Sequence, residues 1–336
     1  MILRKTIVSA GLKTLQSAGL LRIAAASQGR RKRLLILCYH GLSLEDEHHW
    51  LPKLYITPQQ FRTRLQALKD MKASVLTLQE GLARLENGSL PPRSVVLTFD
   101  DGFYDFHKLA LPLLTEFSYP ATLYLTTYYC GKPMPVITLF LDYLIWKSRL
   151  AEVDLSEWGS TGTCPVRTYA ERQQVVRSVL QWMEAKRLST GAKDDVAEEI
   201  AKQLRVDYDA LHQSRMLQII TPEEAIEASR RGVDLQLHTH RHCTPSDRDL
   251  FRREIVDNSD AITALTGHRP LHFCYPSGHY TPEFLPWLGE LGIQSATTCD
   301  RGLADMHSAR LLLPRVLDDS TVEPLRFESF VAGLFA

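Results

Sequence analysis

The chain has 336 residues, of which 44% are hydrophobic, and its formal net charge is +0. This length allows one large core, or one core with an appended subdomain. The neutral charge shows no bias towards nucleic acid, so no nucleic-acid partner is expected. The six cysteines include no Cys-x-x-Cys pair, so we expect reduced thiols and a cytoplasmic location.

Residues 1–33 form a basic segment that leads to the first predicted strand. Apolar residues between Ile2 and Leu21 fit one stripe of a helix, and a run of basic residues follows at 30–33. No long apolar run is present, so neither a cleaved signal peptide nor a transmembrane helix is expected. Two interpretations stay open, a helix in peripheral contact with the anionic inner face of a membrane and a solvated helix packed on the domain.

From residue 34 to the C-terminus, short apolar runs alternate with helical patterns. The predicted strands are Leu34 to Cys38, Val95 to Phe99, Thr122 to Leu125, Asp234 to Leu237, Leu271 to Tyr275 and Gln294 to Thr298. Such compact runs are typical of buried parallel strands. Capping boxes that begin at Thr57 and Thr221 predict two of the helix starts. The alternation predicts an α/β fold whose parallel sheet is open or closed into a barrel.

One stretch, from about 133 to 216, contains no predicted strand. Its helix-like segments lie around 139–150, 170–188 and 194–204. We interpret it as a helical insertion between two barrel strands and expect it to pack beside the mouth of the barrel.

Two adjacent carboxylates follow the strand that ends at Phe99. Asp100 and Asp101 precede Gly102, and the carboxyl ends of parallel strands are where α/β folds build their sites. Neighbouring side chains on an extended chain point opposite ways, so a turn at Gly102 is needed to bring both into one cleft. There one carboxylate can bind a metal while the other accepts a proton. A solvated turn explains the same residues, because Asp and Gly favour turns.

Three of the 12 histidines fall within five residues, at positions 238, 240 and 242, after another predicted strand. Neutral imidazole is a common ligand of zinc-like metals. A turn would put His238 and His242 on one side and His240 elsewhere, whereas an extended segment would align all three. A lone histidine is usually structural, but a triplet at a strand end is less often so.

Two weaker motifs also end predicted strands. Pro276, Ser277 and Gly278 form a loop that can aim a backbone N–H at a developing oxyanion, although these residues are ordinary in turns. His40, in the segment Cys38-Tyr39-His40-Gly41, is placed to act as a general acid or base, although a lone histidine there is more often a satisfied polar residue.

Together these motifs resemble those of the polysaccharide deacetylases, the NodB-homology group also called carbohydrate esterase family four. Residues 98–102 match the first motif of that group, and His238-Thr239-x-x-His242 matches the second. Residues 273–278 are similar to the Phe-Ala-Tyr-Pro-Tyr-Gly form of the third, and Leu313-Pro314-Arg315-Val316 resembles a late strand. The resemblance spans roughly 34–316 apart from the insertion, and implies an irregular TIM-like (β/α) barrel.

The same resemblance implies a metal-dependent hydrolase that removes acetyl groups from N-acetylated sugars of a polysaccharide or its precursor. Asp101, His238 and His242 would hold a divalent metal, with zinc as the first expectation. Asp100 would be the general base, and the backbone N–H of Ser277 would face the oxyanion.

The chain departs from the family pattern in three places. Cys274 replaces an arginine that in many relatives holds the base aspartate, so Arg315 is the candidate replacement. Ser277 stands where an aromatic residue is usual. The late motifs in which many relatives keep their acid are absent, but an early Tyr39-His40 matches the subgroup that acts on exopolysaccharides, so His40 inherits the acid role.

Two other functions stay open. The same fold and metal site could act on another amide or on an O-acetyl ester. A degenerate barrel could instead bind glycan without turnover, which the missing arginine favours and the intact carboxylates and histidines oppose.

Overall fold

The computed structural model describes residues 24–25 and 27–334, so the helix predicted between Ile2 and Leu21 lies outside the described residues. The chain divides into two compact units, one made of residues 1–130 and 220–336 and the other of residues 131–219. No helix in the described part of the chain is long and apolar enough to cross a bilayer.

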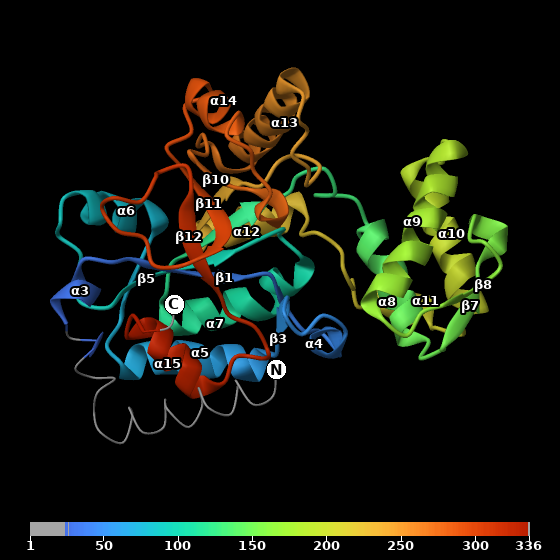
Figure 1. Ribbon diagram of the computed structural model, residues 1–336, viewed down its shortest axis with the longest axis horizontal. Coiled ribbons are helices and arrows are strands. Elements are labelled where there is room, and N and C mark those ends of the chain that lie inside the picture. The colour runs from blue at the N-terminus through green and yellow to red at the C-terminus, as the bar shows by residue number, and fades with distance from the viewer. Residues whose placement is uncertain (1–23, 26, 335–336) are drawn as a thin grey trace. The chain divides into compact units, whose positions relative to one another are not determined.

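The first unit is built on an eight-stranded parallel sheet that closes on itself. The strand order is β1-β12-β11-β10-β9-β6-β5-β4, and β5 also pairs with β1, so every strand except β4 belongs to a closed barrel (Figure 1). The strands are β1 (Leu35–Tyr39), β4 (Ser74–Leu76), β5 (Ser94–Phe99), β6 (Ala121–Leu125), β9 (Val233–Leu237), β10 (His272–Cys274), β11 (Ser295–Arg301) and β12 (Leu313–Leu317). The predicted irregular TIM-like barrel is confirmed.

Continuous burial explains why the barrel strands are readable in the sequence. Every residue of β1, β5 and β6 is buried, because one face of each strand fills the barrel and the other lies under helices. A second, short parallel pair joins β2 (Gly41–Leu42) to β3 (Tyr55–Ile56) just beyond β1. The core strands therefore appear as unbroken apolar runs rather than as alternating patterns.

Helices surround the barrel strands (Figure 1). They are α3 (Gln28–Arg31), α4 (Glu47–Trp50), α5 (Pro58–Asp70), α6 (Leu78–Glu86), α7 (Leu111–Phe117), α12 (Pro222–Arg230), α13 (Arg248–Thr266), α14 (Phe284–Glu290) and α15 (Pro324–Val331), with a π-helical turn at Phe106–Ala110 and a 3-10 turn at Pro276–Gly278. The capping boxes predicted at Thr57 and Thr221 are both formed, and each satisfies orphan N–H groups of the first helical turn.

The second unit is mainly helical, but the expectation that it contains no strand is wrong. Its helices are α8 (Ile137–Lys147), α9 (Tyr169–Ala185), α10 (Thr190–Gln203) and α11 (Tyr208–Gln213), with a 3-10 turn at Ser156–Trp158. Between α8 and α9, β7 (Glu152–Asp154) pairs antiparallel with β8 (Thr163–Pro165). Each strand has only three residues, which is too short for an alternating pattern to stand out from a loop. Its packing beside the barrel mouth stays a prediction.

Candidate active site

A turn at Asp101 and Gly102 directs the side chains of Asp100 and Asp101 towards different partners. Asp101 has φ 71° and Gly102 has φ 89°, both in the left-handed region. A Cβ at Gly102 would lie 2.3 Å from the Leu125 side chain, so this position requires glycine. Because the chain turns here, the side chain of Asp100 reaches Arg315 while that of Asp101 reaches the histidines.

Asp100 forms a buried, two-pronged ion pair with Arg315. Arg315 Nη1 donates to Asp100 Oδ1 at 2.7 Å, and Nη2 donates to Oδ2 at 2.7 Å. Burial alone would raise the pKa of Asp100, but the Arg315 guanidinium outweighs it and holds the pKa well below its usual range. Asp100 is therefore a carboxylate at any working pH, and Arg315 contacts it as the sequence suggested.

Two thiols complete the surroundings of Asp100. The Sγ atoms of Cys274 and Cys38 lie 3.5 Å and 3.7 Å from Asp100 Oδ2, and Arg315 Nη2 lies 3.1 Å from Cys274 Sγ. Burial raises the pKa of both thiols well above their usual range, so both stay neutral. Cys274 thus stands beside Arg315 as a neutral neighbour.

The second carboxylate and two imidazoles form a cluster suited to a metal ion. Asp101 Oδ1 lies 3.3 Å from His238 Nε2 and 3.2 Å from His242 Nε2, and the three ligand atoms all lie within 4.8 Å of one another. Burial would raise the pKa of Asp101, but His242 and His238 hold it well below its usual range. His238 Nδ1 lies 2.8 Å from the Cys274 carbonyl oxygen, so Nδ1 carries a hydrogen and Nε2 faces the cluster. Burial would lower the pKa of His238, but Asp101 and Asp100 raise it above its usual value.

A tight turn decides which of the three histidines come together. Thr239 has φ 62° and His242 has φ 56°, and the Cys243 N–H donates to Thr239 Oγ1 at 3.0 Å. The ring centroids of His238 and His242 are 4.9 Å apart. His240 instead places Nδ1 2.8 Å from Thr127 Oγ1. The turn, and not the extended arrangement, is the one this segment adopts.

Two buried polar residues of α13 hold this turn, and the sequence analysis did not identify them. Asn258 Oδ1 accepts the His238 N–H at 2.9 Å, and its Nδ2 donates to the Leu125 carbonyl at 3.0 Å. Glu254 accepts the Arg241 N–H at 2.7 Å. Both residues lie on the apolar face of α13 beside Ile255, and polar residues in such a face are the signal that could have revealed them.

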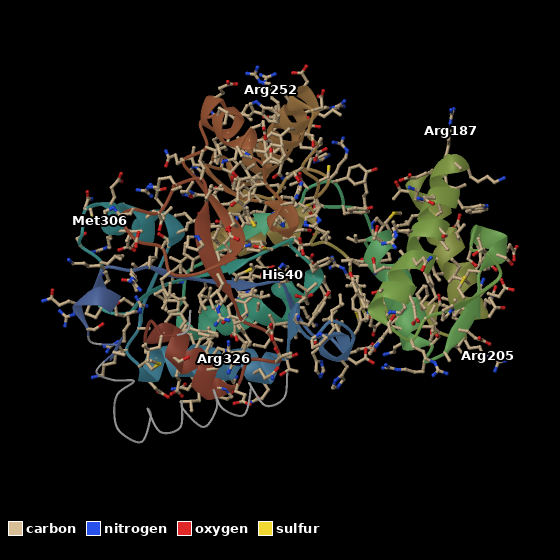
Figure 2. All side chains as sticks on the ribbon, in the orientation of Figure 1. His40, Arg187, Arg205, Arg252, Met306 and Arg326 are labelled. Atoms are coloured by element: carbon tan, nitrogen blue, oxygen red, sulfur yellow. The ribbon has the colours of Figure 1, made fainter. Side chains whose placement is uncertain are left out.

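His40, directly after β1, also faces Asp100. Its Nε2 is 3.8 Å from Asp100 Oδ2, its side chain is 19% exposed, and it is labelled in Figure 2. The next residues are tightly held, because a Cβ at Gly41 would lie 2.2 Å from the Tyr55 ring and the Leu42 N–H donates to buried Asp105 at 3.0 Å. Burial lowers the pKa of His40 below 6.5, so the imidazole is neutral at neutral pH.

Left-handed backbone angles and close contacts constrain the loop after β10. Ser277 has φ 55° and Gly278 has φ 68°, and a Cβ at Gly278 would lie 2.7 Å from Cys299 Cβ. Tyr275 accepts the Gly278 N–H at its carbonyl oxygen, 2.8 Å away. These constraints set the direction of the Ser277 backbone, although the role of its N–H stays a prediction.

The family model for polysaccharide deacetylases matches residues 87–156 and 197–296, a little over half of the chain. The chain belongs to the polysaccharide deacetylase family. The matched segments contain Asp100, Asp101, His238, His242 and Ser277, whereas His40 and Arg315 lie outside them.

Curated relatives are similar in sequence to a short part of this chain. The chain is 38% identical over 76 residues to a poly-β-1,6-N-acetyl-D-glucosamine N-deacetylase of Staphylococcus epidermidis, covering 23% of this chain and 26% of the relative. A protein of the same name from Staphylococcus aureus strain MSSA476 is 34% identical over 77 residues, covering 23% and 27%. The similar part therefore spans about a quarter of the length of these relatives.

Solved structures resemble the whole fold. A Streptococcus pyogenes deacetylase in complex with acetate has a TM-score of 0.57 and 20% identity, covering 88% of this chain and 96% of that one. IcaB from Ammonifex degensii has a TM-score of 0.57 and 16% identity, covering 90% and 97%. A de-N-acetylase from Aggregatibacter actinomycetemcomitans has a TM-score of 0.54 and 15% identity, covering 89% and 99%. At these identities the likeness establishes the fold.

Proposed function

We propose that this polysaccharide deacetylase family member removes acetyl groups from N-acetylated sugars of a polysaccharide or its precursor. One observation carries the proposal: the adjacent carboxylates Asp100 and Asp101 have different partners. One carboxylate is held ionised by Arg315 beside the other, which lies within 3.3 Å of two imidazole nitrogens. A proton acceptor next to a metal-ligand cluster is what hydrolysis of an unreactive amide requires.

The cluster of Asp101, His238 and His242 fits a divalent metal, with zinc as the first candidate. One carboxylate oxygen and two imidazole nitrogens are ligands that zinc accepts, and three protein ligands are typical of its catalytic sites. The orientation of His238 supports this fit, because the Cys274 carbonyl engages Nδ1 and leaves Nε2 facing Asp101 in the cluster. When bound, such an ion supplies Lewis acidity that polarises the amide carbonyl and acidifies a water molecule.

Asp100 is placed to take the proton of the attacking water. Its pKa is held low by Arg315, so it is always ionised, but a carboxylate of low pKa keeps a proton only briefly. We therefore assign Asp100 the role of a first acceptor that passes the proton on. The amide nitrogen needs that proton, because an unprotonated amine is a very poor leaving group.

His40 is the proposed carrier of that proton to the departing amine. Its Nε2 faces Asp100 Oδ2 at 3.8 Å, and its Nδ1 is buried with no hydrogen-bond partner in the described part of the chain. Because burial lowers the pKa of His40, the ring is neutral at rest and free to receive the proton from Asp100. It then protonates the amine as the C–N bond breaks. The backbone N–H of Ser277 is our candidate for a donor to the oxyanion.

The degenerate glycan-binding barrel loses its main support. That alternative rested on the arginine missing from the third motif, which in many relatives holds the base aspartate. Arg315 holds Asp100 here with two hydrogen bonds. An amide or ester other than an N-acetyl sugar stays a possible substrate of the same residues.

Acetate release tests the proposed function. The purified chain is loaded with zinc and incubated with β-1,6-linked and β-1,4-linked N-acetylglucosamine oligomers, with an O-acetylated oligomer as the alternative substrate. We expect acetate from an N-acetylated oligomer, loss of release after chelation, and recovery on adding zinc. An Asp100→Asn variant is expected to keep its metal and lose about 10²–10⁴-fold in turnover. Metal-loaded protein that releases acetate from no N-acetylated oligomer would overturn the proposal.

We further propose a cytoplasmic location with peripheral membrane contact through residues 1–33. The support is compositional, since every charged residue in this segment is basic. Arg30 is buried and donates to the carbonyl oxygens of Val331 and Ser94, so the basic residues that remain for lipid contact are Arg4, Lys5, Lys13, Arg22, Arg31, Lys32 and Arg33. Basic residues beside apolar ones favour anionic lipid surfaces. Sedimentation with vesicles containing about a third phosphatidylglycerol, compared with pure phosphatidylcholine vesicles, tests this. Equal sedimentation with both would count against it.

A further inference from the structure

Asp100 belongs to a second set of metal-ligand atoms, which is separate from the proposed catalytic cluster. Cys38 Sγ lies 3.7 Å from Asp100 Oδ2, and His40 Nε2 lies 3.8 Å from the same oxygen. Cys38, His40 and Asp100 each offer a ligand atom, and these atoms all lie within 4.8 Å of one another. Asp100 also groups with Cys274 and His238, but that group shares His238 with the catalytic cluster. We refer to Cys38, His40 and Asp100 as the thiol site.

Two neighbouring strands hold the thiol site in place. Cys38 and His40 are two residues apart at the end of β1, so both side chains point to the same side. Cys38 pairs with Thr98 in the register of β1 and β5, and Asp100 follows two residues later. The Asp100 N–H donates to the Tyr39 carbonyl at 3.0 Å, which ties the two strand ends together. The three ligand atoms are therefore brought together by the barrel itself.

The spacing of these atoms fits a zinc-like ion. Ligand bonds of about 2.0–2.3 Å at tetrahedral angles place neighbouring ligand atoms about 3.3–3.8 Å apart. The distances from Asp100 Oδ2 to Cys38 Sγ and His40 Nε2 fall in this interval. Cysteine, histidine and aspartate are all zinc ligands, and a thiolate among them disfavours magnesium and calcium. The His40 side chain is 19% exposed, so an ion reaches the site past this ring.

We propose that the thiol site binds a second, thiophilic divalent cation, namely zinc in excess or cadmium, and that this ion inhibits the enzyme. The ion would occupy Asp100 Oδ2 and His40 Nε2, so neither residue could take or carry a proton. The inhibition rests on the proposed function, because it depends on the roles assigned there to Asp100 and His40. The metal site rests on the geometry of the three residues alone.

Charge balance allows such an ion close to Arg315. The pair of Asp100 and Arg315 is neutral as a whole. When Cys38 and Cys274 release their protons to solvent, two thiolates balance the two charges of the ion. Arg315 Nη2, 3.1 Å from Cys274 Sγ, then donates to a thiolate. Because the thiols are neutral without an ion, their protons must be displaced, so we expect weaker binding than at the catalytic cluster and occupancy only from excess metal.

Cadmium binding to the full chain tests the metal site. The protein is first loaded with one equivalent of zinc, and cadmium is then added while the ultraviolet sulfur-to-cadmium charge-transfer band is recorded. Elemental analysis after equilibrium dialysis counts both metals. The wild type should bind cadmium, keep its zinc and show the band, whereas Cys38→Ser should lose the bound cadmium and the band. Cys164→Ser is the matched control, because Cys164 contacts the Gly162 carbonyl and belongs to none of the ligand groups, and it should retain both.

Acetate release in excess zinc tests the inhibition. Each protein is compared with its own rate at one equivalent of zinc, so that any effect of the substitution on the basal rate cancels. Saturating zinc should lower the wild-type rate towards the loss of about 10²–10⁴-fold that blocking a general base causes. Cys38→Ser should be far less sensitive to zinc, and Cys164→Ser should respond as the wild type does. Magnesium at the same concentration should not inhibit.

Outcomes against the inference are equally direct. A cadmium band or a zinc inhibition that is the same in Cys38→Ser and the wild type overturns it. If Cys38→Ser does not fold, Cys38→Ala replaces it, and anomalous diffraction from cadmium-soaked wild-type crystals should place the ion within bonding distance of Cys38 Sγ and His40 Nε2. Cadmium found only elsewhere overturns the site. Cys38-dependent cadmium binding in a protein that releases no acetate would reject the proposed function and keep the metal site.

Discussion

Arg315 donates both of its terminal nitrogens to Asp100, from a position 215 residues further along the chain. The pair is almost completely buried, with side-chain exposures of 1% and 2%. Cys274, on β10, stands 3.1 Å from the same guanidinium. Two strands of the barrel thus contact the Asp100 carboxylate, β12 through the charged guanidinium of Arg315 and β10 through the neutral thiol of Cys274.

Replacing Arg315 should reveal what this pair contributes. Arg315→Gln leaves Asp100 buried without a cation, which costs about 3–5 kcal/mol when a buried pair is broken. The pKa of Asp100 should rise, so its ionised form is lost at a higher pH and the variant gains an acidic limb from Asp100 that the wild type lacks in its working range. Urea unfolding and rate profiles measure both effects. Arg310→Gln is the control, because Arg310 pairs with Glu86 at the surface and such pairs contribute about 0–1 kcal/mol.

Restoring the arginine of the third motif should fail while Arg315 is present. Cys274→Arg would place a second guanidinium where Cys274 Sγ lies 3.1 Å from Arg315 and 3.5 Å from Asp100. One carboxylate cannot compensate two buried cations, and the added volume overpacks the core. We expect a lower midpoint of thermal unfolding and little activity, whereas Cys274→Ala should be tolerated better. A Cys274→Arg variant as stable as the wild type would contradict this description of the site.

Substitutions should distinguish the proposed metal ligands from His240, which is close in the sequence but lies outside the cluster. His242→Ala and Asp101→Ala remove a ligand atom, so bound zinc, measured by elemental analysis after dialysis, should fall to near zero. His240→Ala is the matched control, because His240 contacts Thr127 and lies outside the cluster. It should retain zinc. Equal zinc loss in His240→Ala and His242→Ala would show that the assignment of ligands is wrong.

His40 should affect turnover without affecting metal content. A histidine that is protonated at rest would set an alkaline limb near the ordinary pKa of about 6.5. Burial lowers the pKa of His40, so its neutral form prevails at neutral pH and its titration belongs on the acidic side, below pH 6.5. His40→Ala should therefore keep zinc, lower kcat by about 10²–10⁴-fold and remove that acidic limb. Turnover within a few-fold of the wild type would leave the proton transfer to Asp100 alone.

His272 should make stability depend on pH. Burial lowers its pKa to about 4, and its two ring nitrogens contact Ser295 and Gln79 at 2.8 Å. The unfolded chain binds a proton below pH 6.5 that the folded chain accepts only near pH 4, so stability is complete above pH 6.5 and falls towards pH 4. The loss is at most about 3 kcal/mol.

A variant comparison isolates this effect. His272→Gln should flatten the pH dependence of the unfolding free energy between pH 6.5 and 4, as measured by urea titration at each pH. Exposed His268→Gln should not change it. Buried Asp318, whose pKa burial raises to about 6, titrates in the same range with the opposite sign, but it contributes equally to wild type and variant and cancels in the difference. An unchanged slope in His272→Gln would rule out the assignment.

The alternation of strands and helices predicted a parallel sheet, open or closed, and the motifs placed the functional side chains at its carboxyl end. Strands β1, β5 and β9 end directly before His40, Asp100 and His238. Burial on both faces makes β1 and β5 largely apolar, whereas β9 contains Asp234 and Gln236. Parallel strands put their carboxyl ends on one edge, so these residues were expected to meet. The hairpin of β7 and β8 was missed, because three-residue strands carry too little pattern.

The contacts that hold those side chains form between segments that are far apart in the sequence. Arg315 reaches Asp100 because closure of the barrel sets β12 beside β1, which in turn pairs with β5, and nothing local to either residue encodes that contact. The choice between a turned and an extended histidine segment likewise depended on Asn258 and Glu254 of α13, which bind its backbone. Local sequence sets which face of a strand or helix is apolar. Contacts between distant segments exist only once the chain has closed, so their partners are fixed by packing and hydrogen-bond geometry in the folded state.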